Sequence, residues 1–409
     1  MYDGGLILQH VQESWKMKNL VLFALMAFLW SLAAERHLSA QDLAITNARI
    51  IVGNGTVIER GSIVVRGGRL ASVSAGGANV TGVQTIDAHG MTAMPGFIDA
   101  HRHINTGPNE KQQMQELLDA GYTTILSGGG PAEGNLTLKD HIEKGLIKGP
   151  RIIASGSVRL TLSTEQARAE VRKIAGMGIK FTGEIGLTPK PGPTAKELET
   201  LRAIVDESKK AGIWVQVHAV SPQAMMAAVD AGVPKLVHTP HFGWLAQEDA
   251  ERVAAAGVKQ LSTTGFGVPV FGVFADDNKP RFRDGKPWPE AVLDGEGRGR
   301  EAGYKAVNAR TSWDAGVNYG YGTDTNYQPK AGLEHELKTL NLMFSMPDII
   351  KLMGPNTASY IEMSDQLGTL ETGKLADIVV LDGNPLEGYW NFLRTKLTIK
   401  AGVIVSDQR

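Results

Sequence analysis

Two histidines separated by a single residue follow an apolar stretch in the first third of the chain. His101 and His103 come directly after residues 92–98, whose composition is typical of a β-strand. Side chains two positions apart on a strand point to the same face of the sheet. Both imidazoles can therefore reach one point, as in a two-nitrogen metal chelate. Because the pair follows a buried strand and Pro95-Gly96, we interpret it as the start of a metal site.

The stretch Pro95-Gly-Phe-Ile-Asp-Ala-His-Arg-His103 resembles the signature of the metal-dependent amidohydrolase superfamily, and the resemblance extends from about residue 43 to the C-terminus. It implies a TIM barrel with one or two divalent metals at the C-terminal ends of its strands. Such enzymes hydrolyse amide, lactam, ester or related bonds. The chain resembles the binuclear, glutamate-bridged type, and its Gly183-Glu-Ile-Gly186 is similar to the corresponding strand of the enamidase and imidazolonepropionase-like branch.

The composition is typical of a soluble globular protein. The 409 residues, 42% of them hydrophobic, suffice for one large barrel domain and a second, smaller domain. A net charge of −1 gives no reason to expect nucleic-acid binding. Because the chain has no cysteine, thiolate sites and disulfides are excluded. Metal ligands must therefore be histidines and carboxylates.

The first 41 residues have the pattern of an export signal. Lys16 and Lys18 precede an apolar run at 20–34, which ends in small residues. Met17 is an alternative start, which would make the preceding residues a misassigned extension. An uncleaved anchor is the competing interpretation, but the run is shorter than the ~20 residues of a spanning helix. We expect export to the bacterial periplasm or medium, without stable membrane insertion after cleavage.

A repeated glycine predicts the barrel. In six places a glycine separates an expected helix from an expected strand. The residue six positions after each glycine is polar and ends a mostly apolar run; these residues are Ser127, Ser155, Glu184, His218, His238 and Thr263. The even spacing places all of them on the same face. With the strand before His101 and another at 318–324, eight strands are expected, which predicts a (β/α)8 TIM barrel with polar tips at its C-terminal face.

Further strands are expected at both ends of the chain. They cover residues 43–52, 62–66 and 69–74, and then 374–382 and 397–405. Gly67-Gly68 predicts a tight hairpin turn between two of them. We expect one small β-sandwich built from residues 42–94 and 366–409, with the catalytic barrel at 95–365. Two unrelated edge hairpins are the alternative.

The barrel register predicts one cluster of ligands. Asp324 stands eight residues after Gly316, so its side chain keeps the parity of the other strand tips. The predicted metal ligands are His101, His103, Glu184, His218, His238 and Asp324. Four imidazoles and two carboxylates suit zinc, iron, manganese or cobalt better than calcium or magnesium. We expect two divalent ions, with zinc as the first choice.

Two residues could bridge the metals, because the superfamily uses either a carboxylated lysine or a glutamate. Lys180 and Glu184 share strand parity, so both are candidates to face inward. Four strand residues span ~13 Å, whereas a lysine side chain reaches about 6 Å. We therefore predict that Glu184 is the bridge. Lys180 is expected in the lower layers of the barrel, in a supporting role or paired with a nearby acid.

The resemblance also implies roles for the ligands. One ion would be held by His101, His103, Glu184 and Asp324, and the other by Glu184, His218 and His238. A hydroxide between the ions would attack a polarised carbonyl, because a metal lowers the pKa of water from about 16 to ~7. Asp324 is expected to act as general base and then as general acid on the leaving nitrogen.

Three further features are weaker candidates. His241 could bind substrate at the barrel mouth, or have no role. His335 is expected at the start of the helix after the last strand, where it could support the metal site or cap the helix. Residues 265–300 form a connection long enough to be a substrate lid, and a solvated insertion is the alternative.

These residues favour hydrolysis of an amide-type C–N bond of a small molecule, with a lactam or enamide as the leading substrate type. The alternative is a prolidase-like dipeptidase or an N-acyl amino acid hydrolase. A deaminase is disfavoured because His218-Ala-Val-Ser221 lacks the His-x-x-Glu acid of those relatives. A non-catalytic scaffold is the remote alternative, since all six ligand positions are filled. The substrate and any homo-oligomer are left open by the sequence.

Overall fold

The computed structural model describes residues 42–77, 82–265, 298–325 and 328–409. The predicted signal segment at 1–41 and most of the predicted lid at 265–300 lie outside these residues. Within the described residues, no helix combines the length and the apolar character needed to cross a membrane.

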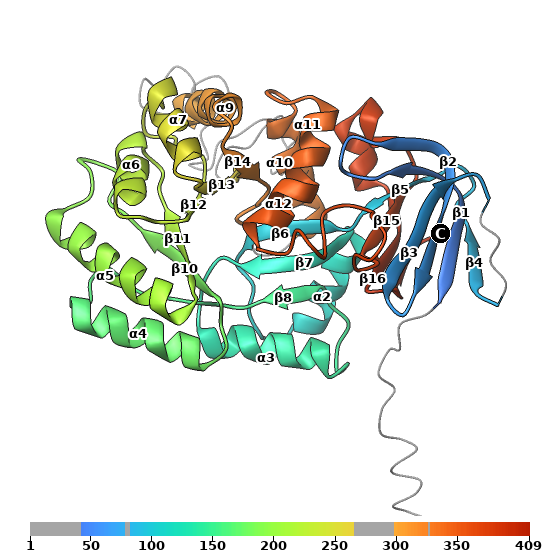
Figure 1. Cartoon of the computed structure of the whole chain (residues 1–409), viewed down its shortest axis with the longest axis horizontal. Helices are drawn as coiled ribbons and strands as arrows, with labels where there is room; N and C mark the ends of the chain where they lie inside the picture. The colour runs from blue at the N-terminus through green and yellow to red at the C-terminus, as the bar shows by residue number, and fades with distance from the viewer. Residues whose placement is uncertain (1–41, 78–81, 266–297, 326–327) are drawn as a thin grey trace, which may run out of the picture. The chain divides into compact units, whose positions relative to one another are not determined.

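Strands from both ends of the chain form one sheet, drawn in blue and red in Figure 1. Its strands are β1 (Leu43–Ile51), β2 (Val57–Arg66), β3 (Arg69–Ala75), β4 (Gln84–Asp87), β5 (Thr92–Pro95), β15 (Ile378–Leu381), β16 (Thr395–Lys400) and β17 (Val403–Asp407). The order is β17-β16-β15-β5-β1-β2-β3, with β4 paired to β1. Alternate side chains of these strands, such as Ile63 and Val65, are buried in one apolar cluster. The predicted sheet from both termini is confirmed, and its division into a sandwich stays a prediction.

Two expected strands are divided differently in the structure. The expected strand at 397–405 is a hairpin, because the chain turns at Ala401-Gly402, both with positive φ. The expected strand at 92–98 is split at Gly96: β5 pairs with β15, whereas β6 (Phe97–Arg102) pairs with β7 (Tyr122–Ser127). A side chain at Gly96 would collide with Thr123. The glycine thus permits the chain to pass from the terminal sheet into the parallel strands.

The parallel strands alternate with helices, as expected for a TIM-barrel-type fold. After β6 and β7 they are β8 (Arg151–Ile153), β9 (Ser155–Gly156), β10 (Phe181–Gly186), β11 (Trp214–His218), β12 (Lys235–Val237), β13 (Lys259–Leu261) and β14 (Asn318–Gly320). The ladders form a three-stranded sheet, β6-β7-β8, and a six-stranded sheet, β14-β13-β12-β11-β10-β9. Only Ala154 separates β8 from β9. Beyond β14, Asp324 N donates to His101 O at 2.8 Å, so this segment lies beside β6.

Most of the helices flank these strands (Figure 1), whereas the last two lie near the terminal sheet. They are α2 (Glu110–Asp119), α3 (Ala132–Glu143), α4 (Thr164–Gly176), α5 (Ala195–Ala211), α6 (Pro222–Asp230), α7 (Gln247–Ala255), α9 (Arg298–Asp314), α10 (Pro329–Leu340), α11 (Met346–Lys351), the π-helix η1 (Leu352–Asn356), α12 (Thr357–Tyr360) and the 3-10 helices η2 (Pro385–Glu387) and η3 (Tyr389–Leu393). Helix α5 shows how the sequence fixes both ends. Thr194 and Glu197 form a capping box at its start, and Gly212 ends it with a φ of +68°.

Candidate metal centre

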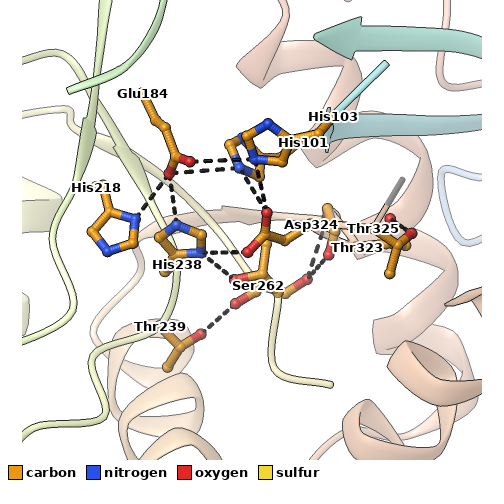
Figure 2. Close-up of polar contacts among 12 residues, drawn as sticks. His101, His103, Glu184, His218, His238, Thr239, Ser262, Thr323, Asp324 and Thr325 are labelled. Atoms are coloured by element: carbon orange, nitrogen blue, oxygen red, sulfur yellow. Dashed lines mark hydrogen bonds and ion pairs between the residues drawn. The ribbon is translucent and has the colours of Figure 1, made fainter. Parts of the chain in front are cut away.

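All six side chains predicted as metal ligands lie together in the structure (Figure 2). They come from β6 (His101) and the residues just after it (His103), β10 (Glu184), β11 (His218), and the segments after β12 (His238) and β14 (Asp324). Each lies at or just beyond the C-terminal half of a parallel strand. They form two groups that share Glu184, and within each group the candidate ligand atoms lie within 4.8 Å of one another.

Glu184 lies between the two groups. Its Oε2 is 2.9 Å from His218 Nδ1 and 2.8 Å from His238 Nε2. Its Oε1 is 3.3 Å from His103 Nε2, and its Oε2 is 3.6 Å from His101 Nε2. One carboxylate therefore faces all four imidazoles, which is the geometry that a bridging ligand requires.

The predicted inward position of Lys180 is wrong. Its side chain is exposed, and it belongs to neither ligand group. Strand β10 begins only at Phe181, so the alternation of a strand does not extend back to Lys180. Strand parity therefore does not fix the direction of the Lys180 side chain.

Asp324 approaches the same imidazoles from another direction. Its Oδ1 is 3.0 Å from His103 Nε2 and 3.4 Å from His101 Nε2, and its Oδ2 is 4.0 Å from His238 Nδ1. The backbone at Asp324 has a φ of +54°, and His238 has a φ of +76°. Such a left-handed conformation is unfavourable for a residue with a side chain and is concentrated at functional sites.

The charges of the cluster favour a cation. Burial opposes ionisation, but the surrounding imidazoles hold the pKa of Glu184 and that of Asp324 well below their ordinary range. Contacts with Asp324 and Glu184 raise the pKa of His103 to about 10, whereas burial lowers the pKa of His238 to about 4. The two carboxylates therefore remain ionised, and a metal cation would compete with protons for the imidazole nitrogens.

The surroundings of His101 test whether these residues fit a metal. Its side chain is fully buried, and neither ring nitrogen makes a hydrogen bond in the described part of the chain; Nε2 only faces the carboxylates of Asp324 at 3.4 Å and Glu184 at 3.6 Å. A buried polar atom without a partner is costly, and a cation bound beside it would remove that cost. Gly128 leaves room for the ring, because a Cβ there would lie 2.7 Å from His101 Cε1. With nitrogen and oxygen donors only, the cluster fits a transition-metal site.

Thr263 orients one of these imidazoles. Its Oγ1 lies 2.8 Å from His238 Nδ1, while the Nε2 of the same ring points to Glu184. A hydrogen bond donated by Nδ1 leaves the lone pair of Nε2 available to a metal. The glycine spacing predicted a polar strand tip at Thr263, but no contact with His238. Its φ is +43°, so Thr263 has a left-handed backbone conformation, as His238 and Asp324 do.

Asp99 supports the cluster from below and was not predicted. Its Oδ1 accepts a hydrogen bond from the backbone N–H of His101 at 3.1 Å, and its Oδ2 accepts a hydrogen bond from Arg102 Nε at 3.0 Å. It also accepts two hydrogen bonds from Thr323, the neighbour of Asp324. Asp99 stands two residues before His101, so strand parity is a signal that could have placed it on the face of the histidine, but no local pattern indicates its partners.

The two weaker histidine candidates lie outside both ligand groups. His241 donates its Nδ1–H to Thr239 O at 3.4 Å, and burial, helped by the nearby Lys305 cation, lowers its pKa to about 3. Its substrate contact stays a prediction. His335 is the seventh residue of α10 and is buried, so its predicted place at the helix start is wrong.

The residue after His335 has a clearer role. Glu336 is buried, and it accepts hydrogen bonds from the backbone N–H groups of Thr264 at 2.9 Å and Gly265 at 2.6 Å. It thereby fixes the chain just after Thr263. Burial raises the pKa of Glu336. Glu336 is not among the predicted site residues.

Comparisons with known proteins agree with this geometry. The model of the Amidohydrolase family matches residues 92–406. The chain is 23% identical to imidazolonepropionase of Thermoanaerobacter pseudethanolicus over 80% of this chain and 84% of that one. It is 29% identical to N-acyl-D-aspartate deacylase of Alcaligenes xylosoxydans xylosoxydans over 46% of this chain and 39% of that one. A solved structure described as a candidate prolidase from Bifidobacterium longum has a TM-score of 0.75 and 25% identity, and covers 91% of this chain and 97% of that one.

Proposed function

Because the chain belongs to the Amidohydrolase family and is a metal-dependent hydrolase acting on C–N bonds, we propose that it uses two divalent ions to open an amide-type bond of a small molecule. A cyclic amide is the leading substrate type. Zinc is the leading metal, with iron, manganese and cobalt as alternatives. The fold proposed for this chemistry is a closed (β/α)8 barrel in which β8 and β9 act as one strand.

One observation supports two ions most directly, namely that Glu184 is shared by two groups of ligand atoms. The first ion would be held by His101, His103, Glu184 and Asp324, and the second by Glu184, His218 and His238. The ions, when bound, would lower the pKa of a bound water and polarise the carbonyl group of the substrate.

The chain's own residues supply orientation and proton transfer. The side chains of His103 and His218 are 35% and 36% exposed, whereas those of His101 and His238 are 0% and 5% exposed. Substrate therefore approaches on the side of His103 and His218. Asp324 is ionised and lies beside the ligands of the first group, so it can take a proton from the attacking water and donate it to the leaving nitrogen.

The relatives support a cyclic amide without excluding an acyclic one. The imidazolonepropionase match spans 84% of that enzyme, and its name refers to an imidazolone ring, which is a cyclic amide. The N-acyl-D-aspartate deacylase and the candidate prolidase favour a second proposal, an N-acyl amino acid hydrolase or a prolidase-like dipeptidase. Export through the N-terminal segment is also a proposal, and it rests on the sequence alone.

A substrate panel tests this function. Protein loaded with zinc would be assayed on five- and six-membered lactams, N-acyl amino acids, Xaa-Pro dipeptides and lactones, with metal-stripped protein as the control. The proposal predicts turnover of at least one C–N substrate that depends on metal. Turnover of lactones alone, or equal turnover without metal, would contradict it.

A further inference from the structure

A pocket of about 670 Å³ opens directly beside the metal centre. Glu184 forms part of its wall, so the pocket and the two ligand groups share a side chain. The other walls come from residues 157–161, which follow β9, and from the connection between β10 and α5. A substrate that reaches Glu184 from this side would place its remaining atoms in the pocket.

The segment after β9 presents a cation to this pocket. Val158 and Leu160 are buried in the main apolar cluster, whereas Ser157, Arg159 and Thr161 are exposed. Alternate side chains of this segment therefore pack into the apolar cluster, and the side chains between them face solvent. Arg159 is thus held at the pocket wall by the residues on either side of it.

A second cation comes from helix α5. Lys196 lies in the first turn of α5 and lines the same pocket. Within the described residues, neither Lys196 nor Arg159 has a carboxylate partner. Arg172 of α4 differs in this respect, because Glu207 lies 3.1 Å from its guanidinium.

The two acids in the pocket wall already have partners. Glu184 faces the four imidazoles, and Glu197 accepts hydrogen bonds from Thr188 Oγ1 at 2.8 Å and Thr194 N at 2.7 Å. These hydrogen bonds lower the pKa of Glu197 although burial opposes the shift. Among the described residues, the pocket therefore contains two cations without counter-ions, and both of its carboxylates already have other partners.

We propose that this pocket binds a carboxylate of the substrate through Arg159 and Lys196. The substrates would then be C–N compounds that bear an anionic carboxylate, such as N-acyl amino acids or lactam carboxylic acids. This inference rests on the proposed function, because it assumes that the bond to be cleaved lies at the ligands around Glu184. It limits the proposed cyclic amides, and the proposed N-acyl amino acids and dipeptides, to compounds that carry a negatively charged carboxylate.

Matched substrate pairs test the inference. On zinc-loaded protein, kcat/KM would be compared for N-acetylglycine and N-acetylglycinamide, and for pyroglutamate and pyroglutamamide. Wild type should prefer the acids. In Arg159→Gln and Lys196→Gln, kcat/KM for the acids should fall about tenfold more than for the amides, mainly through KM, because a charge-assisted hydrogen bond is lost. Arg159→Lys should recover part of the preference.

Lys209→Gln provides the matched control. Lys209 is exposed on the same helix, 13 residues after Lys196, which places it about 20 Å away along the axis. This variant should keep the acid preference of wild type. An equal loss on acids and amides in the pocket variants, or no loss at all, would overturn the inference while leaving the proposed function intact.

A binding measurement separates the remaining outcomes. Calorimetric titration of N-acetylglycine into zinc-loaded wild type should show binding that Arg159→Gln/Lys196→Gln weakens at least tenfold. If no substrate is turned over but this difference is found, the anion site stands and the proposed reaction fails. If N-acetylglycine does not bind, or binds both proteins equally, the inference fails whatever the activity.

Discussion

Asp99 accepts two hydrogen bonds from Thr323, one from the backbone N–H at 3.1 Å and one from the hydroxyl at 2.6 Å, although 224 residues separate them in sequence. Asp99 is on the strand that carries His101, and Thr323 precedes Asp324. The pair therefore holds the first two histidines and the predicted catalytic carboxylate in a fixed relation. This contact forms below the metal ligands and does not itself include one.

Asp99→Asn should destabilise the fold strongly. Arg102 is fully buried and its Nε donates to Asp99, so removing the carboxylate charge leaves a buried cation uncompensated. Breaking a buried ion pair costs about 3–5 kcal/mol. Urea unfolding of metal-free protein measures the loss. Asp140→Asn, which removes an exposed pair with Lys144, should cost less than about 1 kcal/mol. Equal losses in the two variants would contradict this role.

Asp324→Asn should retain fold and metal but lose nearly all turnover. The amide preserves the shape of the side chain, yet it cannot accept a proton at neutral pH. General acid–base catalysis contributes roughly 10²–10⁴-fold, and kcat should fall by that factor. Elemental analysis and circular dichroism of the same sample show whether metal and fold persist. An unchanged kcat would refute the assigned role.

Thr263→Val should weaken metal binding. Valine matches threonine in shape and branching at this left-handed position, but it removes the hydroxyl that meets His238 Nδ1. Loss of such a supporting hydrogen bond typically costs 10–100-fold in affinity or activity. Competition with a zinc chelator measures the affinity, and Thr263→Ser, which keeps the hydroxyl, should remain close to wild type. Similar affinities for the valine and serine variants would speak against this orientation.

His241 should make the fold less stable in acid. Its pKa is about 3 in the folded chain and about 6.5 when unfolded, so between these values only the unfolded chain binds the proton. Its contribution is present above pH 6.5 and is lost as the pH falls towards 3. Between pH 8 and pH 5 wild type should lose about 2 kcal/mol more than His241→Asn, as measured by urea unfolding of metal-free protein. Identical losses would show that His241 is not buried in its neutral form.

The sequence predicted the metal cluster because strand geometry is periodic. The glycine spacing placed Glu184, His218 and His238 at one level, and the structure brings their ligand atoms together. The same rule failed for Lys180, because parity holds only within a strand and β10 starts one residue later. His238 and Asp324 lie beyond the ends of β12 and β14 and have positive φ, so strand parity alone does not account for the direction of their side chains.

The supporting contacts could not be predicted in the same way. Asp99 with Thr323, and Glu336 with Thr264, join residues that are far apart in sequence. Their pairing depends on how the strand ends and α10 pack, and no local pattern encodes that packing. The division at Gly96 was missed for a related reason, since it depends on the close approach of Thr123.

The metal content of the protein tests the central claim most directly. Elemental analysis of wild type, after zinc loading and removal of free metal, should give about two ions per chain, as expected for a two-metal site. His218→Asn removes a ligand of one group, whereas Glu184→Gln weakens both, so the glutamine variant should retain less metal than the asparagine variant. Near-zero metal in wild type, or full occupancy in Glu184→Gln, would contradict a centre bridged by this carboxylate.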